Sequence, residues 1–157
     1  ATSPDKQFRD LYEQWQINMD AIGIRMRPLV KQWPEHLKAS RAGKLMMWGV
    51  GWTGGPDGDT FLALGYGPNK GQANHARFDL PAFNALNLRQ RVLPDGPERE
   101  ALVQQALRLS LAYMPIKATA HPINSWLTHS HVHGFVPHPF IRDYWRYMDA
   151  DAAAAPH

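Results

Sequence analysis

The chain of 157 residues contains no cysteine, which excludes disulfides, thiol catalysis and cysteine-ligated metal sites. It also lacks any apolar run that approaches the roughly 20 residues of a membrane span. Its first ten residues, ATSPDKQFRD, have no apolar centre of the kind found in a signal peptide. The formal net charge is only +3, and the basic residues are dispersed rather than gathered in a stripe with stacking aromatics. We therefore expect no membrane span in this chain and no nucleic-acid partner.

Hydrophobic residues make up 44% of the chain, enough for the core of one domain. Apolar residues recur at helical spacing in four segments, and this pattern predicts helices over residues 3–23, 33–43, 80–93 and 94–115. Ser3 is the expected cap of the first helix, and Asp95 with Glu98 resembles a capping box for the last. The last helix is expected to bury one stripe, formed by Leu102, Ala106, Leu109 and Tyr113.

Three segments predict strands, at residues 24–32, 44–52 and 116–123. The second is apolar on both faces, as a buried parallel strand would be. Because a predicted helix separates the first strand from the second, the order is that of a right-handed βαβ unit. The sequence therefore predicts an α/β fold, with one short helical turn at residues 60–67.

The glycine-rich segment WTGGPDGD begins at Trp52, directly after the second predicted strand. Ligands of open α/β sheets bind outside the carboxyl ends of the strands, and glycines allow the backbone to approach them closely. Trp52 would form either a flat apolar wall of such a site or part of the core, and the sequence leaves both open. Trp48, inside the predicted strand, is expected in the core.

Four motifs follow one another along nearly the whole chain. MDAIGIRMRPLVKQWPEHLKASRAGKLMMWGVGW contains a helix, an IGI motif, a helix ended by glycine and a strand ended by GW. PDGDTFLALGYG and NHARFDLPAFNALNLRQRVLPDGPEREALVQQALRLSLAYMPI follow, and VHGFVPHPFIRDYWRYMDAD closes the series. In this order the motifs resemble the C-terminal part of the family 5 extracellular solute-binding proteins, the receptors of peptide, dipeptide and nickel ABC importers.

The resemblance implies a lobe of a type II periplasmic-binding-protein fold and a chain that is a piece of a longer protein. Residues 1–129 would belong to the second lobe, and residues 130–157 would return to complete the first. The two lobes would close on a peptide or a similar small solute and deliver it to an ABC permease in the inner membrane. This places the protein in the periplasm, with its signal peptide outside this fragment, and predicts a binding protein without cofactor or enzymatic activity.

The resemblance also suggests which residues face the ligand. Peptide-binding members carry an aspartate three residues after the GW tryptophan, where this chain has Gly55. Asp57 would substitute for that aspartate or cap the following turn. Asn74 and Arg77 match family positions on a loop that faces the cleft, and Arg77 would pair with either a ligand carboxylate or Asp79. The expected ligand-binding residues are Trp52, Thr53, Gly54, Gly55, Asp57, Asn74 and Arg77.

An alternative function is suggested by THSHVHGFVPH, in which His129, His131 and His133 alternate. On a strand these three imidazoles would share a face and could bind zinc or nickel, as a metal-binding or metal-dependent hydrolase domain. No H-E-x-x-H motif accompanies them, and GWTGG lacks the serine of a hydrolase elbow. A third possibility is an interaction domain whose partner surface is FIRDYWRYM.

Overall fold

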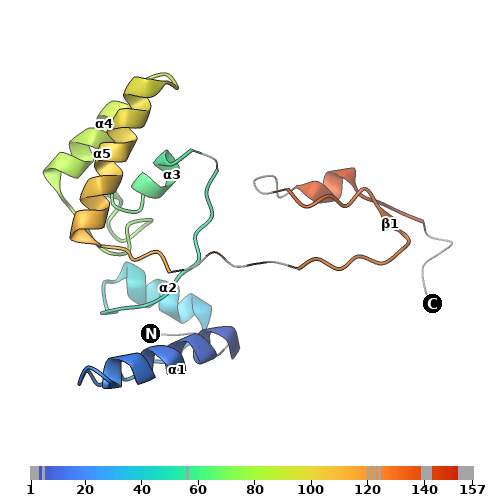
Figure 1. Cartoon of the computed structure of the whole chain (residues 1–157), viewed down its shortest axis with the longest axis horizontal. Coiled ribbons are helices and arrows are strands. Elements are labelled where there is room, and N and C mark those ends of the chain that lie inside the picture. Colours follow the sequence, from blue (N-terminus) through green and yellow to red (C-terminus); the bar gives the residue numbers. More distant parts are fainter. Residues whose placement is uncertain are drawn as a thin grey trace.

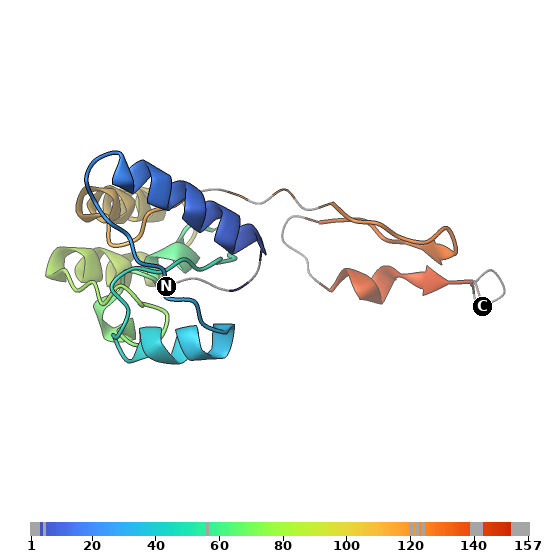
Figure 2. The same cartoon turned by 90° about the horizontal axis from the view of Figure 1, so that it is seen from below.

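A computed structural model of the chain describes residue 4 and residues 6–55, 57–119, 121, 123, 125–138 and 143–151. Helices dominate the part before residue 115, and the described residues after 125 extend away from them in both views (Figures 1 and 2). The elements are α1 (Lys6–Asp20), α2 (Trp33–Arg41), α3 (Asp59–Leu62), η1 (Gly67–Asn69), α4 (Pro81–Arg91), α5 (Pro97–Tyr113), β1 (Val132–His133), η2 (Tyr144–Tyr147) and β2 (Asp149–Ala150). No helix in these ranges is both long and apolar enough to cross a bilayer.

The core lies where α4 and α5 pack side by side, with α3 against α5 (Figure 1). Its fully buried members come from all three helices and are Leu62, Phe83, Val103 and Ala106. Helical spacing therefore predicts this part well, because Leu102 and Ala106 are buried as expected. Tyr113 is expected in the same stripe but is 61% exposed; it is the last residue of α5, and its ring contacts Phe78 at the edge of the core.

Glycine ends both N-terminal helices. Gly23 and Gly43 have φ values of 78° and 69°, in the left-handed region where glycine is favoured. The Lys44 amide bonds to the carbonyl oxygen of Ala39, and the Gly43 amide bonds to that of Ser40, which is a Schellman motif. The predicted ends of α1 and α2 are thus explained by local backbone chemistry.

The predicted helix starts are less accurate. Ser3 lies outside the described residues. The capping box at α5 is wrong, because Gly96 occupies the N-cap and no side chain caps the helix. Asp95 instead accepts a hydrogen bond from Arg99, at 2.8 Å. The Asp95 carboxylate, which the sequence predicts as a cap for the backbone amides at the helix start, thus binds the Arg99 side chain instead.

The βαβ unit is absent from the described chain. Residues 24–29 and 44–55 have extended or bent backbone without strand hydrogen bonding, and the described residues of segment 116–123 form no strand. A strand needs a partner to satisfy its amides and carbonyls, and two strands alone are marginally stable in water. The only sheet in the described ranges is the pair of β1 and β2 in the C-terminal part, and these segments do not add to it. The α/β prediction is therefore confirmed only as a helix-rich chain with few strands.

The strands that do form belong to the C-terminal part. β1 pairs antiparallel with β2, with Val132 opposite Ala150 and His133 opposite Asp149. Three aromatic rings gather beside this pair: Trp126, Phe135 and Tyr144 have centroids 5.2–5.6 Å apart. Many apolar side chains around them remain exposed, among them Leu127 at 99%. The described residues of 125–138 and 143–151 thus form a small aromatic unit apart from the core of the helices (Figure 2).

Candidate functional site

Five aromatic side chains from three separate segments meet next to the glycine-rich loop. The ring of Trp48 lies 5.8 Å from Trp33, 6.4 Å from His36 and 5.1 Å from His75, measured between centroids. Trp52 extends the group, with its ring 6.4 Å from His75. We call these residues the tryptophan–histidine cluster. It joins α2, the loop before α3 and the loop before α4, so it assembles only in the folded chain.

Exposure differs widely within this cluster. His36 is 2% exposed, Trp48 and His75 are half-buried, and Trp33 and Trp52 are 46% and 41% exposed. Trp48 is therefore only partly a core residue, contrary to the simple expectation for an interior strand. Trp52 presents an accessible apolar face, as a wall of a ligand site would.

Both histidines of the cluster have a lowered pKa. Burial lowers the pKa of His36, and burial together with the nearby Arg41 lowers the pKa of His75. His75 Nδ1 lies 2.9 Å from the Ser40 hydroxyl oxygen, a hydrogen bond that fixes the ring. His36 Nε2 is buried without a partner among the described residues. The environment of both rings thus disfavours their charged form.

The rim loop, which we define as residues 52–55, carries four of the predicted ligand residues. Trp52, Thr53 and Gly55 are exposed, whereas Gly54 is half-buried. A Cβ added at Gly54 would approach the Phe61 ring to 3.0 Å, so glycine is needed there for close packing on α3. The sequence predicted close backbone approach at these glycines, and at Gly54 the approaching group is this chain's own ring.

Asp57 fixes the end of this loop. Its Oδ1 accepts a hydrogen bond from the Asp59 amide at 3.0 Å, which confirms that Asp57 caps the turn leading into α3. Its Oδ2 lies 2.6 Å from Arg99 Nη1, and Asp59 Oδ2 lies 3.5 Å from Arg99 Nη2. The amide of Asp59, followed by the guanidinium of Arg99, lowers the pKa of Asp57. With Asp95, three carboxylates surround one cation, and we call this group the Arg99 ion cluster.

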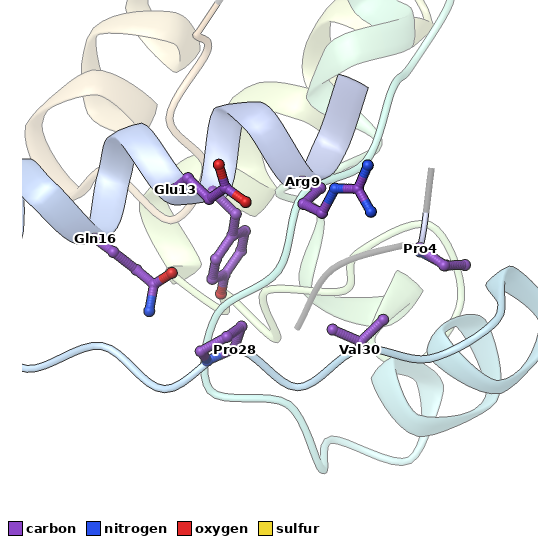
Figure 3. Close-up of a pocket in the computed structure, with 7 residues that line it drawn as sticks. Pro4, Arg9, Glu13, Gln16, Pro28 and Val30 are labelled. Carbon is purple, nitrogen blue, oxygen red and sulfur yellow. The ribbon is translucent and has the colours of Figure 1, made fainter. Parts of the chain in front are cut away.

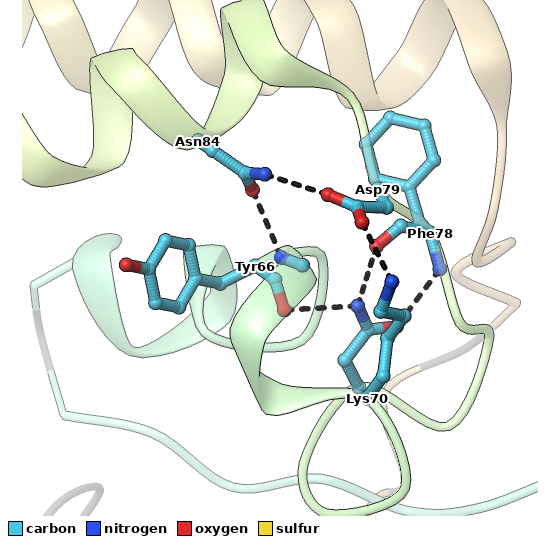
Figure 4. Close-up of polar contacts among 7 residues, drawn as sticks. Tyr66, Lys70, Phe78, Asp79 and Asn84 are labelled. Carbon is cyan, nitrogen blue, oxygen red and sulfur yellow. Dashed lines mark hydrogen bonds and ion pairs between the residues drawn. The ribbon is translucent and has the colours of Figure 1, made fainter.

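Asn74 is completely buried and organises the loop that carries His75. Its Nδ2 donates hydrogen bonds to the carbonyl oxygens of Tyr66 and Phe78, at 2.9 and 2.7 Å, and its Oδ1 accepts one from the Phe78 amide. Figure 4 shows these bonds converging from both sides of the loop. All three hydrogen bonds of the Asn74 side chain are made to backbone groups of other residues. They fix the backbone of this loop, and Asn74 thereby positions its neighbour His75.

A second polar group closes the same loop (Figure 4). Asp79 pairs with Lys70 at 2.6 Å and accepts a hydrogen bond from Asn84 at 2.8 Å. The bond from Lys70, followed by that from Asn84, lowers the pKa of Asp79. Asn84 Oδ1 in turn accepts a hydrogen bond from the Gly67 amide, at 2.8 Å. These contacts fasten the loop to the start of α4.

Arg77 does not pair with Asp79, whose carboxylate Lys70 already occupies. Its Nη2 donates a hydrogen bond to the carbonyl oxygen of Arg41, 2.6 Å away at the end of α2. A Cβ added at Gly43 would lie 2.5 Å from the Arg77 guanidinium, so this glycine makes room for the cation. Arg77 itself is exposed and has a positive φ of 56°. The alternative partner proposed from sequence is therefore wrong, while its ligand role remains a prediction.

The alternating histidines are only partly brought together. The rings of His129 and His131 stack at 5.3 Å, and His133 lies in β1. Within the described ranges, no group of three or more histidine and carboxylate side chains is arranged to hold a metal ion. The structure adds no observation that favours a metal-dependent function.

A cavity of about 360 Å³ lies elsewhere, between α1 and the segment before α2 (Figure 3). Its lining residues are Pro4, Arg9, Tyr12, Glu13, Gln16, Pro28 and Val30. The cavity is open, and none of the residues predicted to bind ligand lines it. It is therefore a feature separate from the rim loop.

Sequence reasoning missed three residues that shape this site: His36, His75 and Arg99. Their importance comes from contacts 12 to 42 positions apart in the chain, which periodicity does not report. One local signal was available for Arg99, because Asp95 lies four positions before it, just ahead of the start of α5. For the histidines, no local pattern points to the tryptophans.

No protein-family model matches the chain. Several curated proteins, however, are similar to it in sequence. The chain is 32% identical to "Heme-binding protein A" of Haemophilus influenzae over 124 residues, which cover 78% of this chain and 23% of that protein. It is 30% identical to "Dipeptide-binding protein" of Pseudomonas aeruginosa over 133 residues, and 29% identical to "Di/tripeptide-binding protein 3" of the same species. Those two matches each cover 83% of this chain and 25% of the relative.

The chain thus spans about a quarter of the length of the relatives that it matches. All the relatives named above are binding proteins, and none carries the name of an enzyme. The expectation of a binding protein rather than an enzyme agrees with these names.

Proposed function

The chain belongs to the family 5 extracellular solute-binding proteins, and from this premise we propose that it serves as part of the substrate-binding component of an ABC importer. The observation that carries the proposal is identity of about 30% to several binding proteins, maintained over some four fifths of the chain. The complete receptor would capture a small solute in the periplasm and deliver it to a permease in the inner membrane. No bond is made or broken in this function.

The relatives bind dipeptides, tripeptides or heme according to their names, and we propose peptides or similar small solutes for this protein. Residues 1–129 would belong to one lobe of a type II binding-protein fold, and residues 130–157 would complete the other. Segments 24–29 and 44–55 form no strand in the described part of the chain, which is consistent with this assignment, because the complete lobe would offer a larger sheet to which they could add. The ligand would lie between the lobes, and their closure would trap it.

The rim loop is the proposed contact surface of this lobe. Trp52 supplies an exposed ring, and Thr53, Gly54 and Gly55 supply backbone groups beside it. Arg77, which is exposed on the neighbouring loop, is the proposed partner of a ligand carboxylate. Asp57 and Asn74 would contribute indirectly, since their hydrogen bonds hold the two loops in place.

Substitution of Trp52 by alanine in the full-length receptor tests this proposal. Burying the exposed 41% of Trp52 corresponds to roughly 100 Å², or about 2.5 kcal/mol at ~25 cal/mol per Å². The variant should therefore bind its solute about 70-fold more weakly. Mass spectrometry of molecules that co-purify with the receptor would identify the solute, and calorimetry would measure its affinity.

The matched control is Trp145→Ala, which removes an exposed tryptophan from η2, far along the chain from the rim loop. It should leave the affinity within about twofold. Equal affinities for the wild type and Trp52→Ala would remove the rim loop from the binding site.

A further inference from the structure

Both acidic side chains of segment 49–59 are already engaged within this chain. Asp57 uses one carboxylate oxygen for the Asp59 amide and the other for Arg99. Asp59 pairs with the same guanidinium and accepts a hydrogen bond from Thr60. The rim loop is therefore followed by two carboxylates that are not available to a ligand cation unless the Arg99 ion cluster breaks.

The ring that contacts Trp52 belongs to His75, which also contacts Trp48. Burial, together with the nearby cation Arg41, lowers the pKa of His75. Arg77, on the same loop as His75, donates a hydrogen bond from its guanidinium to the carbonyl oxygen of Arg41. A ligand ammonium placed against Trp52 would thus lie beside aromatic rings, while both carboxylates of segment 49–59 are already paired with Arg99. An ammonium group removed from water without a counter-charge is strongly disfavoured.

We propose that this rim contacts solutes at an end that carries no free ammonium group, and that glycine at position 55 sets this preference. Among peptides, the favoured ligands would be those with a blocked amino terminus, because a neutral amide can stack on Trp52 without leaving a buried charge unpaired. The inference rests on the proposed function, since it assigns a substrate class to the same site.

Gly55 is the position at which a carboxylate could be introduced. Among the described residues, a Cβ at Gly55 would meet no atom within 4 Å, and its φ does not lie in the left-handed region. Gly55 is also exposed, unlike Gly54, where a Cβ would press on Phe61. Substitution by aspartate is therefore expected to leave the loop intact while it supplies the missing counter-charge.

The experiment compares two probes, Ala-Phe and N-acetyl-Ala-Phe, by calorimetry on the full-length receptor. The wild type should bind the acetylated peptide about tenfold more tightly or better. Gly55→Asp should shift the ratio of the two dissociation constants toward the free peptide by about 10- to 100-fold, the range expected for a charge-assisted hydrogen bond. Because the ratio is measured within one variant, it does not depend on the fraction of active protein.

The control is Gly51→Asp, which adds the same charge at another exposed glycine where a Cβ meets no atom within 4 Å. It should leave the ratio unchanged. Equal binding of the two probes by the wild type, or preference for the free peptide, overturns the inference but leaves the proposed function standing. An unchanged ratio in Gly55→Asp, or an equal shift in the control, removes Gly55 from specificity. Binding of neither probe contradicts the proposed peptide class, and this inference with it.

Discussion

Replacing Asn74 by alanine should destabilise the chain more than any other single loss of an amide side chain in its loops. Asn74 is completely buried and makes three hydrogen bonds to backbone groups of two residues. The Tyr66 carbonyl keeps a second donor, the Asn69 amide, but both backbone groups of Phe78 lose the bond that Asn74 provides. At about 1 kcal/mol for each bond, with an additional penalty for buried groups left unpaired, the cost is about 3–5 kcal/mol.

Urea unfolding followed by circular dichroism would measure this loss, as a lower midpoint with an unchanged slope. At about 2–4 °C for each kcal/mol, the melting temperature should fall by roughly 10 °C. The matched control is Asn69→Ala, which removes a single bond to the Ala63 carbonyl oxygen and should cost about 1 kcal/mol. Asn74→Asp offers a second test, because an oxygen in place of Nδ2 would face two carbonyl oxygens. A cost below 1 kcal/mol for Asn74→Ala would refute the view that this side chain organises the loop.

Two further predictions concern the core and the buried histidines. Phe83→Ala removes the largest buried ring between α4 and α5 and should lower the free energy of unfolding by about 3–5 kcal/mol in the same urea assay, whereas Leu88→Ala, on the half-exposed side of α4, should cost less than 1 kcal/mol; equal costs would contradict the assigned core. Because the folded-state pKa values of His36 and His75 lie below the ordinary 6.5, the unfolded chain binds more protons in the interval below 6.5. The contribution of these histidines to the free energy of unfolding should therefore be fully present above pH 6.5 and be lost as the pH falls below it. Urea midpoints that stay constant from pH 7.5 to 5 would disprove the lowered pKa values of the two histidines.

The sequence predicts those parts of the fold that depend on neighbours along the chain. The ends of α1 and α2 follow from Gly23 and Gly43, and the turn after Asp57 follows from an oxygen two residues before the amide that it caps. α4 and α5 follow from helical spacing because they cover each other. At these helix ends and at this turn the stabilising group lies within one or two turns of the residue that it stabilises, and α4 and α5 follow each other directly along the chain.

The remainder depends on partners that local patterns do not specify. Segment 44–52 has the composition of a buried strand, but it forms no strand, because no neighbouring strand lies beside it in the described part of the chain. Trp48 and Trp52 were identified as notable from sequence, whereas His75, which touches both, was not. The contacts of His75 with the two tryptophans join two loops that the core between α3, α4 and α5 brings together. They can therefore be recognised only once the fold is known.

The Arg99 ion cluster also constrains how this chain can change over generations. One guanidinium serves three carboxylates, Asp57, Asp59 and Asp95, so the loss of a single acid leaves the cation with two partners. Loss of Arg99 instead leaves three negative charges side by side, next to the loop that carries Trp52. Substitution of any one of the three aspartates is thus expected to be tolerated, whereas substitution of Arg99 is not. The effect of a second substitution among the aspartates should depend strongly on the first.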